Sequence, residues 1–516
     1  MLLLGLLGAI ASLVHAGPVP PVTMRRTDRV VVVGGGPAGV HYASLLAKKG
    51  LSNIIVLEAT DRVGGKSATA IDDQGRPQEM GTVFALDTYQ PIFDLASEYD
   101  PDNTKYAFSF EQPGYMHCMG ESAGAADSDP FTSLDWPEYL LRSIYINAPP
   151  QVQRRNNTNE LRALFVDQLQ QYIDIHRGLF GVYPYGMPPR PSDPSIFDMT
   201  AIEFLRSYDL LTLSGMFRFS QQQQGYGVLE TIPAFYFLWW SHPDAVSRMI
   251  HSQVAGKACA YMFTKGFQSI WKSISFAHRK SVTTIFGANV TRISRGLVTG
   301  TTPSVTYTTG HGAPTTIECD HVVMAIDLSL FATLVTDLTT SERALFTTSY
   351  TSSTFVTTLF QSLPSPAETA AQVWFYRMGQ KKDGRLCALR NTRFTQVYQG
   401  GGSTRWGDLL LGRQTRVAYQ FYDRPLAQVD QTTTGPLLRS DLALAGMNDV
   451  ELWHQRHFNY FPRFTTNGLK MGLPWKIWAI QGQQRTTWIG SSVCFESALD
   501  VITYNNNLIQ RLQLRP

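Results

Sequence analysis

Glycines able to hold a phosphate group lie close to the N-terminus, at the end of an unbroken run of valines. Gly34, Gly36 and Gly39 have the G-x-G-x-x-G spacing and lead into an apolar-periodic segment, His41 to Lys49. The first glycine allows a tight turn, the second lets backbone approach a pyrophosphate, and the third lets a helix pack closely on a strand. A pyrophosphate would then lie on the unpaired N–H groups and the positive dipole end of that helix.

The elements around this turn follow the order of a dinucleotide-binding unit. Val30 to Val33 is predicted to be a buried parallel strand, because an unbroken β-branched run suits a sheet covered on both faces. A second strand, Asn53 to Leu57, ends at Glu58, whose carboxylate is placed to accept hydrogen bonds from an adenosine ribose. The sequence therefore predicts dinucleotide binding, with Pro37 and Ala38 in the same turn, while the spacing alone leaves NAD and FAD open.

A second glycine-rich turn follows the ribose-binding acid and carries positive charge. The segment Asp61-Arg62-Val63-Gly64-Gly65-Lys66 resembles the R-x-G-G-R segment of the flavin amine oxidase superfamily. Glu79-Met80-Gly81-Thr82 resembles the acidic-apolar-Gly-Gly/Ala turn beneath the flavin in that superfamily. Lys66 stands where the superfamily has an arginine, which keeps the charge but loses the bidentate fork. The resemblance implies FAD as the cofactor and assigns to it Arg62, Gly64, Gly65, Lys66, Gly81 and Thr82.

The C-terminal segment Thr486 to Leu512 has the pattern of a strand, a glycine turn and a long helix. It resembles the closing motif of the superfamily, in which the helix N-terminus stabilises negative charge that develops at flavin N1 and O2 on reduction. The glycine turn matches, but two serines replace Thr-Glu after it, and the spacer to the helix is shorter. Earlier in the chain, a valine matches the residue whose backbone touches the adenine. The residues that these matches assign to FAD are Val290, Gly490, Ser491, Ser497 and Ala498.

The resemblance to a monoamine-oxidase-like protein covers the whole FAD domain. The middle of the chain is similar to a fungal branch of secreted or vesicular flavoproteins typified by β-cyclopiazonate dehydrogenase. Nothing matches the Ser-Gly-Gly-Cys-Tyr segment that attaches FAD through a thioether, so Cys494 is the candidate tether, with a buried structural cysteine as the alternative. Neither Lys470 nor Lys476 has the context of the lysine that holds a water at flavin N5.

Length and composition predict a large globular protein. The 516 residues exceed one ordinary core, and 43% hydrophobic with 16% charged residues are not the composition of a disordered or fibrous chain. Forty-four basic against 41 acidic residues give a net charge of +3, so no nucleic-acid partner is expected. The expected fold class is α/β: a Rossmann-type FAD-binding domain interleaved with an α+β substrate domain of helices and a mixed sheet floor. The segments are 1–16 (signal peptide), 17–95, 261–335 and 471–516 (FAD-binding domain), and 96–260 and 336–470 (substrate domain).

Residues 1–16 are apolar and end in Val14-His15-Ala16, the pattern of a cleaved secretory signal, with an uncleaved anchor or a buried helix as alternatives. The run is too short for a comfortable membrane span, so no stable span is expected after signal removal. Sequons at Asn156 and Asn289 agree with a secreted or vesicular glycoprotein. Five scattered cysteines have no zinc-binding spacing, and no metal is expected, including at Met116 to Met119.

Periodicity predicts the elements of the substrate domain. Helices are expected over Leu161 to Ile175, Met199 to Tyr208 and Asp449 to Phe458. Gln221 to Gln224 is interpreted as a solvated turn, and Ile232 to Trp240 as a helix that fills the core or in part walls a substrate pocket. Segments expected to form an antiparallel sheet are Ser353 to Phe360, Val373 to Phe375, Gly384 to Leu389 and Arg416 to Phe421.

The resemblance implies an FAD-dependent oxidoreductase, dehydrogenase or oxidase, that moves a hydride from a small hydrophobic secondary metabolite to flavin N5, giving desaturation or oxidative cyclisation. Molecular oxygen or another acceptor would then take the electrons. Tyr460, Trp475 and Trp478 lie where family members carry aromatic pocket walls, with core packing as the alternative. The alternatives are a secreted amine or amino-acid oxidase that releases hydrogen peroxide and a flavin-binding protein without turnover. The paired turn Gly64-Gly65 disfavours an NAD-dependent dehydrogenase.

Overall fold

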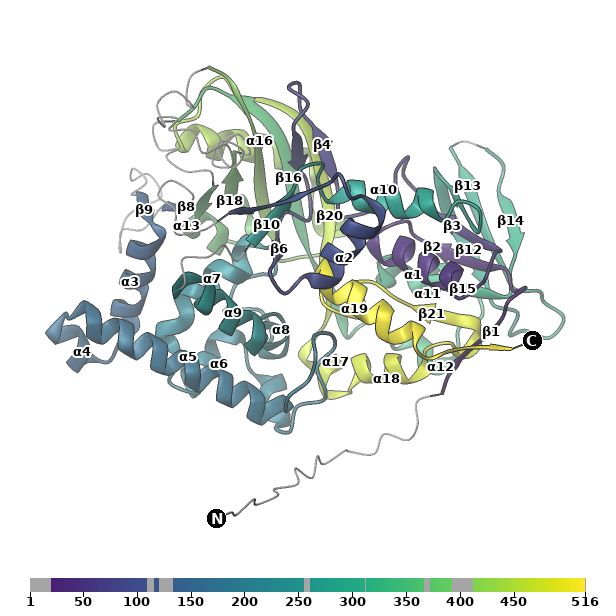
Figure 1. The fold of residues 1–516 in the computed structure, drawn as a ribbon, viewed down its shortest axis with the longest axis horizontal. Coiled ribbons are helices and arrows are strands. Elements are labelled where there is room, and N and C mark those ends of the chain that lie inside the picture. Colours follow the sequence, from purple (N-terminus) through teal and green to yellow (C-terminus); the bar gives the residue numbers. More distant parts are fainter. Residues whose placement is uncertain are drawn as a thin grey trace, which may run out of the picture.

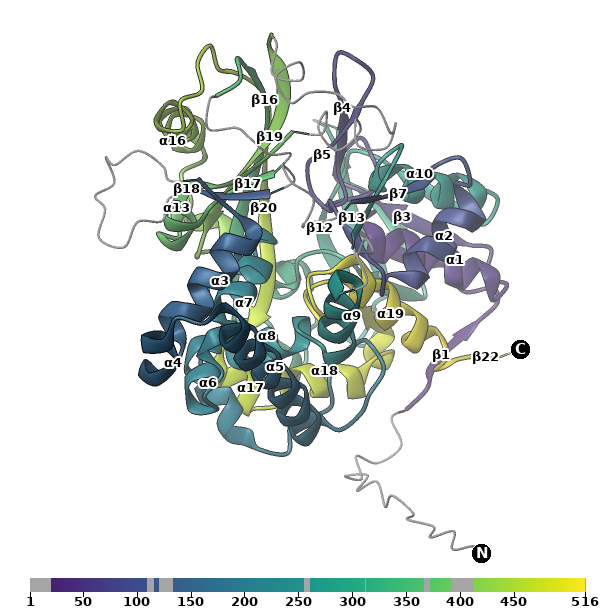
Figure 2. The same cartoon turned by 60° about the vertical axis from the view of Figure 1, so that its left-hand side comes forward.

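The computed structural model describes residues 20–108, 116–119, 133–254, 260–310, 312–365, 372–391 and 412–515. Figure 1 shows a parallel sheet with its helices on the right, a long mixed sheet at the top and a layer of helices at the lower left. Helix α19 (Ala498–Ile509) lies between these regions, and Figure 2 shows the same arrangement from a second side. Within the described residues, no helix combines the length and apolar character needed to cross a membrane.

A five-stranded parallel sheet forms the nucleotide-binding region, in the order β11-β3-β2-β15-β21. Its central strand β2 (Val30–Val33) pairs with β3 (Ile54–Leu57) on one side and β15 (His321–Met324) on the other. The outer strands are β11 (Val282–Ile285) and β21 (Thr486–Trp488). All four valines of β2 are buried, as expected for a strand covered on both faces. The predicted α/β, Rossmann-type region is confirmed.

Segments far apart in the sequence complete this region. Helix α1 (Pro37–Lys48) follows β2 and packs against α10 (Phe267–Ala277) and α19. It begins four residues before the predicted helix, because proline suits a first helical turn. The strand β1 (Val22–Arg25) pairs in parallel with β22 (Leu512–Arg515), so the two ends of the described chain lie side by side (Figure 1).

The sheet of the substrate domain has seven strands in the order β20-β16-β19-β18-β17-β8-β9. All four predicted strand segments lie in it, so the antiparallel sheet is confirmed, although β17 and β8 pair in parallel. The strands are β16 (Tyr350–Ser362), β17 (Gln372–Phe375), β18 (Asp383–Arg390), β19 (Gln414–Tyr422), β20 (Glu451–Phe464), β8 (Met116–Met119) and β9 (Ser133–Asp135).

The helix predicted over Asp449 to Phe458 is wrong, because these residues belong almost entirely to β20. This strand pairs antiparallel with β16 from Glu451 to Phe464, with two register shifts. The long partner strand supplies hydrogen bonds that local helical periodicity cannot reveal, and tertiary pairing overrides the local preference.

A layer of helices covers the other side of the substrate domain. The helix predicted over Leu161 to Ile175 is the central part of α5 (Thr158–Phe180), and the aromatic segment forms α8 (Ala234–Trp240) with all but its last residue buried. The prediction for Gln221 to Gln224 is wrong: Gln221, Gln222 and Gln223 end α7 (Ser214–Gln223) and are 0%, 1% and 7% exposed. The turns of α7 before them are mostly buried, so the amides follow the helix into the interior.

The remaining helices and strands connect these layers. The strands are β4 (Thr69–Ile71), β5 (Pro77–Glu79), β6 (Ala85–Leu86), β7 (Lys105–Phe108), β10 (Ala260–Phe263), β12 (Ala288–Ser294), β13 (Ser304–Thr309) and β14 (Thr315–Glu318). The helices are α2 (Gln90–Tyr99), α3 (Trp136–Asn147), α4 (Pro150–Arg155), α6 (Ala201–Ser207), α9 (Pro243–Val254), α11 (Phe331–Leu334), α12 (Thr340–Arg343), α13 (Tyr376–Gln380), α16 (Gln431–Leu444), α17 (Thr466–Lys470) and α18 (Leu473–Ile480). The predicted segment boundaries between the two domains stay predictions.

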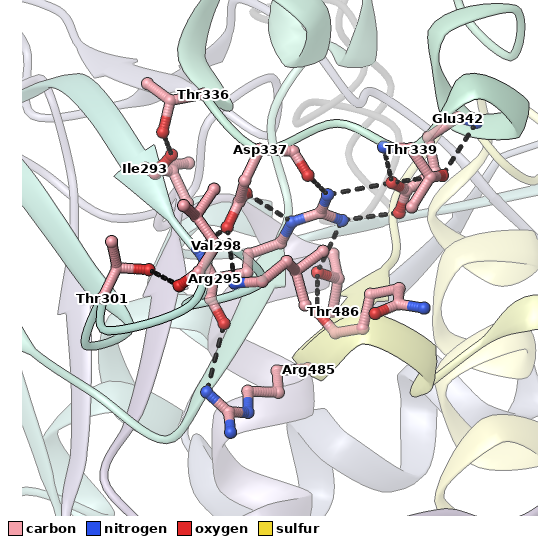
Figure 3. Close-up of polar contacts among 12 residues, drawn as sticks. Ile293, Arg295, Val298, Thr301, Thr336, Asp337, Thr339, Glu342, Arg485 and Thr486 are labelled. Carbon is pink, nitrogen blue, oxygen red and sulfur yellow. Dashed lines mark hydrogen bonds and ion pairs between the residues drawn. The ribbon is translucent and has the colours of Figure 1, made fainter.

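A buried arginine ties the end of β12 to the segment that leads out of the nucleotide-binding region (Figure 3). The Arg295 guanidinium donates to Asp337 Oδ1 at 3.0 Å and to both carboxylate oxygens of Glu342, at 2.5 and 2.9 Å. It also donates to the Asp337 carbonyl at 2.7 Å and to Thr486 of β21 at 3.4 Å. Two carboxylates thus compensate one fully buried cation, and three separate segments are fixed to one another.

Candidate active site

A cavity of about 280 Å³ lies at the carboxyl ends of β2 and β3 and at the N-termini of α1 and α19. Open α/β sheets bind ligands at this edge, where strand ends and helix starts meet. The cavity gathers residues predicted from four separate parts of the chain. Those that line it are Gly34, Gly36, Pro37, Ala38, Glu58, Gly65, Lys66, Thr82, Gly490, Ser491, Ser497 and Ala498.

The glycines of the first turn have the conformation and spacing that a phosphate cradle requires. Gly34 has φ +106°, a value that residues with a side chain rarely adopt. A Cβ atom at Gly39 would lie 1.9 Å from the Gly34 carbonyl oxygen, so only glycine lets α1 pack this close to β2. Gly36 itself lines the cavity, where a side chain would take up space needed by a ligand.

The Glu58 carboxylate is buried and already oriented. Its Oε2 accepts the Gly35 N–H at 2.7 Å, and its Oε1 accepts the N–H and the hydroxyl of Thr60 at 2.9 and 2.7 Å. A carboxylate has about four lone-pair sites, so these three bonds leave about one site for a ribose hydroxyl of a dinucleotide. The contacts fix the carboxylate at the cavity wall before any ligand is bound.

The two helix ends at the cavity differ in charge. The N-terminus of α1 has neither a capping side chain nor an acidic residue in its first turn, so its N–H groups are open to an anion. At α19, Ser497 accepts the Asp500 N–H at 3.0 Å and donates to the Asp500 carboxylate at 2.5 Å. Burial raises the pKa of Asp500 to about 6. The α1 end is therefore the better site for a pyrophosphate.

A second, narrower cavity of about 60 Å³ adjoins the first. The two share Lys66, Thr82, Tyr460, Glu496, Ser497 and Ala498 in their walls. A single water needs about 10–15 Å³ of such space, so the narrow cavity has room for only a small group. Most of its other walls are aromatic, from Phe84, Tyr89, Tyr226, Phe355, Tyr419 and Phe458.

Four of these rings form a continuous row. The Tyr419 and Phe355 ring centroids are 5.7 Å apart, and those of Phe355 and Tyr460 are 5.2 Å apart. Tyr460 and Tyr226 follow at 6.0 Å, with ring planes only 5° from parallel. Burial raises the pKa of Tyr226 and of Tyr460 well above 10, so both phenols stay neutral. The row gives the narrow cavity a rigid wall, and one of its rings, Tyr460, also lines the larger cavity.

An ion pair lies at the junction of the cavities. The Lys66 ammonium is 2.5 Å from Glu496 Oε2, which also accepts the Phe461 N–H at 2.9 Å. The ammonium lies 5.3 Å from the centroid of the Tyr460 ring, and Tyr226 donates to the Glu496 carbonyl at 2.9 Å. Among the described residues, none donates a hydrogen bond to Glu496 Oε1. One carboxylate oxygen is thus held and the other is unpartnered at the cavity wall.

Comparison with known proteins gives the family. The sequence profile described as "Flavin containing amine oxidoreductase" matches residues 37–404. The chain belongs to this family. FAD is therefore its cofactor, and the protein is an FAD-dependent oxidoreductase, as the two glycine turns and the closing motif predicted.

Two known proteins match nearly the whole length of this flavoprotein at low sequence identity. A polyenoic fatty acid isomerase of Ptilota filicina is 22% identical over 507 residues, with 94% of each chain covered. The structure of a CLA-producing fatty acid isomerase from P. acnes matches with a TM-score of 0.65 and 18% identity, over 95% of this chain and 99% of that one. A flavin-containing amine oxidase of Oncorhynchus mykiss is 42% identical over only 77 residues, 15% of each chain. The narrower resemblance to β-cyclopiazonate dehydrogenase stays a prediction.

The residues of the larger cavity fit FAD, although some predicted contacts lie elsewhere. Gly39 packs α1 on β2, and Gly64, with φ +115°, shapes the second turn. Arg62 donates to the Gly65 carbonyl at 3.1 Å, so it braces that turn. Gly81 lines the narrow cavity, whereas Val290 lies half-buried in β12 and lines neither cavity.

The candidate tether and the candidate lysines do not lie at the cavities. The Cys494 thiol is buried, donates to the Gly490 carbonyl at 3.2 Å and has a pKa raised well above 9 by burial. Lys470 pairs with Asp198 outside both cavities, and Lys476 is exposed. Lys66 is the lysine in the walls of both cavities. No cluster of metal-ligating side chains occurs among the described residues, which exclude the side chains of Met116 to Met119.

Of the three predicted pocket aromatics, the structure brings only Tyr460 to the cavities. Trp475 and Trp478 line neither cavity, so core packing, the other predicted role, is the one that the structure gives them. Trp475 donates to the Pro188 carbonyl at 3.0 Å and packs with the core, while the Trp478 ring lies 4.9 Å from that of Tyr504. Both lie on α18, where packing against neighbouring helices decides the side-chain directions.

Sequence reasoning missed most of the narrow cavity. Tyr226 was visible only as part of a glycine-flanked turn, and Glu496 only as a residue of the shortened closing motif. Phe355 and Tyr419 each lie in a predicted strand, and alternation within a strand indicates which of its residues share a face with them. Their common cavity depends on the pairing of β16 with β19, which no local pattern contains.

Proposed function

We propose that this flavoprotein takes a hydride from an activated C–H bond of a small, flat, hydrophobic substrate and leaves a new carbon–carbon double bond or ring. The observation that supports this most strongly is the narrow aromatic cavity that adjoins the FAD site and shares its wall. When bound, the oxidised flavin accepts the hydride with both electrons of the C–H bond. Molecular oxygen or another acceptor then takes the electrons away.

The side chains of the narrow cavity would hold the substrate flat. The parallel rings of Tyr226 and Tyr460 offer apolar faces with neutral hydroxyls, and rigid aromatic walls position a ligand at low entropic cost. Burial against such walls also excludes water from the reacting carbon. The full-length similarity to fatty acid isomerases supports oxidation at a hydrocarbon C–H bond over oxidation of an amine.

Glu496 would act as the base. Once the hydride has left one carbon, the adjacent C–H bond becomes acidic, and a carboxylate in reach can take that proton as the double bond forms. Glu496 is the only carboxylate among the described residues that line the narrow cavity. Lys66 and the Phe461 N–H hold its Oε2, which leaves Oε1 to accept the proton. The pairing with Lys66 keeps the carboxylate oriented.

Anaerobic mixing with a substrate panel tests the proposal. The panel contains 3-phenylpropanoate, linoleate, benzylamine and putrescine, and loss of the blue absorbance of flavin reports hydride transfer. We expect bleaching by a hydrocarbon substrate, with a product two hydrogens lighter, and a Glu496→Gln variant slower by roughly 10²-fold or more. Bleaching by the amines alone would overturn the assignment in favour of amine oxidation. FAD retention by the variant serves as the control for folding.

A secreted or vesicular location remains part of the proposal. The acceptor residues of both sequons are exposed, Asn156 after α4 and Asn289 in β12, so glycosylation meets no steric barrier. The predicted signal, residues 1–16, lies outside the described residues. Expression in a eukaryotic host should give a protein that lacks these residues and whose electrophoretic mobility increases after enzymatic deglycosylation. A full-length, unmodified intracellular product would contradict the proposal.

A further inference from the structure

The narrow cavity has a polar end that the proposed hydride transfer does not use. Gln223 lines it from the end of α7 and is 7% exposed, yet neither its Nε2 nor its Oε1 has a hydrogen-bond partner among the residues that the structure describes. An unpaired buried amide costs about 1–3 kcal/mol, so such groups are usually satisfied. The neighbouring Gln222 shows the usual case, since its Nε2 donates to the Tyr376 carbonyl at 3.1 Å. Gln223 therefore has hydrogen-bonding capacity that a ligand can use.

A buried cation lies behind the same end of the cavity. Arg390 ends β18 and is 1% exposed, and its cross-strand partner on β17 is Gln372, which lines the cavity. Its Nη2 donates to the Glu79 carbonyl at 2.7 Å, whereas Nε and Nη1 have no hydrogen-bond partner in the part of the chain that the structure describes. The guanidinium carbon lies 5.9 Å from the centroid of the Tyr419 ring, the first ring of the aromatic row.

No carboxylate of the described residues forms an ion pair with Arg390. The nearby Glu79 directs its carboxyl elsewhere, to the Phe267 N–H at 2.7 Å and the Thr69 hydroxyl at 2.8 Å. A buried charge without a counter-ion is strongly unfavourable, and an anion placed near it gains more than it would in water. An amide alone would fit a neutral or an anionic group equally, and the adjacent guanidinium favours the anion.

We propose that Gln223 and Arg390 form the anchor for a carboxylate group of the substrate, at the end of the narrow cavity away from the FAD site. The inference rests on the proposed function, because it assumes that this cavity holds the substrate. A carboxylate there would accept a hydrogen bond from Gln223 Nε2 and lie in the field of Arg390. The hydrocarbon part would extend along the rings of Tyr419, Phe355 and Tyr460 toward the flavin, which makes the substrate a small hydrophobic carboxylic acid.

Binding of cinnamate tests the anchor without any turnover. Cinnamate is flat and anionic and has no saturated C–H bond to donate, so its binding is measured by titration of the FAD-loaded protein, calorimetrically or from the flavin spectrum. Methyl cinnamate has the same shape without the charge. We expect cinnamate to bind at least about tenfold more tightly than the ester, the size of one hydrogen bond to a charged group. Equal binding of acid and ester would overturn the proposal.

Variants separate the anchor from general effects on the cavity. Gln223→Leu and Arg390→Met should each weaken cinnamate about tenfold and leave methyl cinnamate within about twofold. Gln223→Glu places a like charge at the site and should reject cinnamate while it still binds the ester. Gln221→Leu, two residues away on the same helix and outside the cavity wall, should change neither ligand.

The outcomes distinguish this proposal from the proposed function. Selective binding of the carboxylate without hydride transfer from any hydrocarbon acid would support the anchor and contradict the proposed reaction. Hydride transfer together with equal affinity for acid and ester would support the proposed reaction and contradict the anchor. If Arg390→Met fails to retain FAD, Gln223→Leu and Gln223→Glu still test the anchor, because they alter only the end of a helix at the cavity. Loss of ester binding in step with cinnamate in those variants would also overturn the anchor.

Discussion

Two buried arginines of this flavoprotein have opposite surroundings. Arg295 is fully buried and bonded to Asp337 and Glu342, so its charge is compensated within the chain (Figure 3). Arg390 is equally buried but donates to one backbone carbonyl and lacks a carboxylate partner among the described residues. A buried cation that is paired with carboxylates of the chain stabilises the fold. A buried cation without such a partner, close to a cavity, can be compensated by an anionic ligand. The difference separates a structural arginine from a binding one.

The largest expected effect comes from breaking the compensated site. Arg295→Met leaves two buried carboxylates without their cation, and we expect a loss of about 3–5 kcal/mol in the free energy of unfolding. Arg390→Met removes a buried charge without a counter-ion and should raise, rather than lower, the free energy of unfolding of the ligand-free holoprotein. Denaturant unfolding of FAD-loaded protein, followed by tryptophan fluorescence, measures both.

The acid dependence of the Arg295 site gives a second readout of the same contrast. Burial alone would raise the pKa of Glu342, but its hydrogen bonds with Arg295 and Thr339 reverse this and lower it below 4.5. A carboxyl whose pKa is lower in the folded than in the unfolded protein stabilises the fold at pH values above its unfolded-state pKa. This contribution is lost as the pH falls through the folded-state pKa. Wild-type protein should therefore lose stability below about pH 4.5 more steeply than Glu342→Gln. Equal slopes, or a large stability loss in Arg390→Met, would contradict the contrast.

Stabilisation by bound cinnamate should depend on Arg390 and not on Arg295. At a cinnamate concentration one hundred times its Kd, wild-type protein gains about 2.7 kcal/mol of stability. Arg390→Met, with Kd raised tenfold, should gain only about 1.4 kcal/mol at that concentration. Arg295→Met, although less stable overall, should keep the full gain, because its site lies outside the narrow cavity. A gain that shrinks equally in both variants would show that the cinnamate site depends on general stability. Thermal unfolding with and without cinnamate measures this.

A smaller effect of pH is expected at Glu79. Burial raises the pKa of Glu79 from 4.5 to about 7. Between these values the folded protein binds more protons than the unfolded one, so the contribution of Glu79 to stability falls as pH rises toward 7. The charge that appears above pH 7 partly compensates Arg390 and should weaken cinnamate by roughly threefold to tenfold between about pH 6 and about pH 8.

Glu79→Gln is the control for this pH effect. The glutamine keeps the shape and a hydrogen-bond acceptor but cannot ionise, so the affinity for cinnamate should stay flat over that pH range. Methyl cinnamate should be insensitive to pH in both proteins. A wild-type affinity for cinnamate that does not change across pH 7 would show that Glu79 does not share the field of Arg390.

The cofactor site was predictable from the sequence, whereas the narrow cavity was not. The valine strand, the glycine turns and Glu58 are local features, each fixed by residues within a few positions of one another. Tyr460 was predicted from its position before the closing motif. Phe355 and Tyr419 reach the cavity, and Arg390 lies behind it, through pairings of β16, β18 and β19. Such long-range register has no local signal.

The error at Gln221 to Gln224 has the same cause. Amide runs are common in solvated turns, and nothing in the four residues indicates that the helix before them is buried. Their burial depends on contacts from distant strands, since the Cys387 thiol of β18 donates to the Gln222 carbonyl at 3.4 Å. A polar run at the end of an otherwise apolar helix is thus compatible with a cavity wall as well as with a solvated turn.

The smallest expected effect concerns Gln221, which is fully buried and lies outside the cavity wall. Neither amide atom has a hydrogen-bond partner within the described ranges. Gln221→Leu removes an unsatisfied buried amide and keeps a similar volume, so we expect the free energy of unfolding to rise by about 1 kcal/mol. Gln223→Leu should give a similar rise in ligand-free protein but weaken cinnamate. The same unfolding measurements in the presence of cinnamate then distinguish the two amides. Gln221→Leu should keep its higher free energy of unfolding relative to wild type, whereas for Gln223→Leu this difference should shrink or reverse. If Gln221→Leu weakens cinnamate as well, the polar end of the cavity extends further along α7 than the wall of the ligand-free structure.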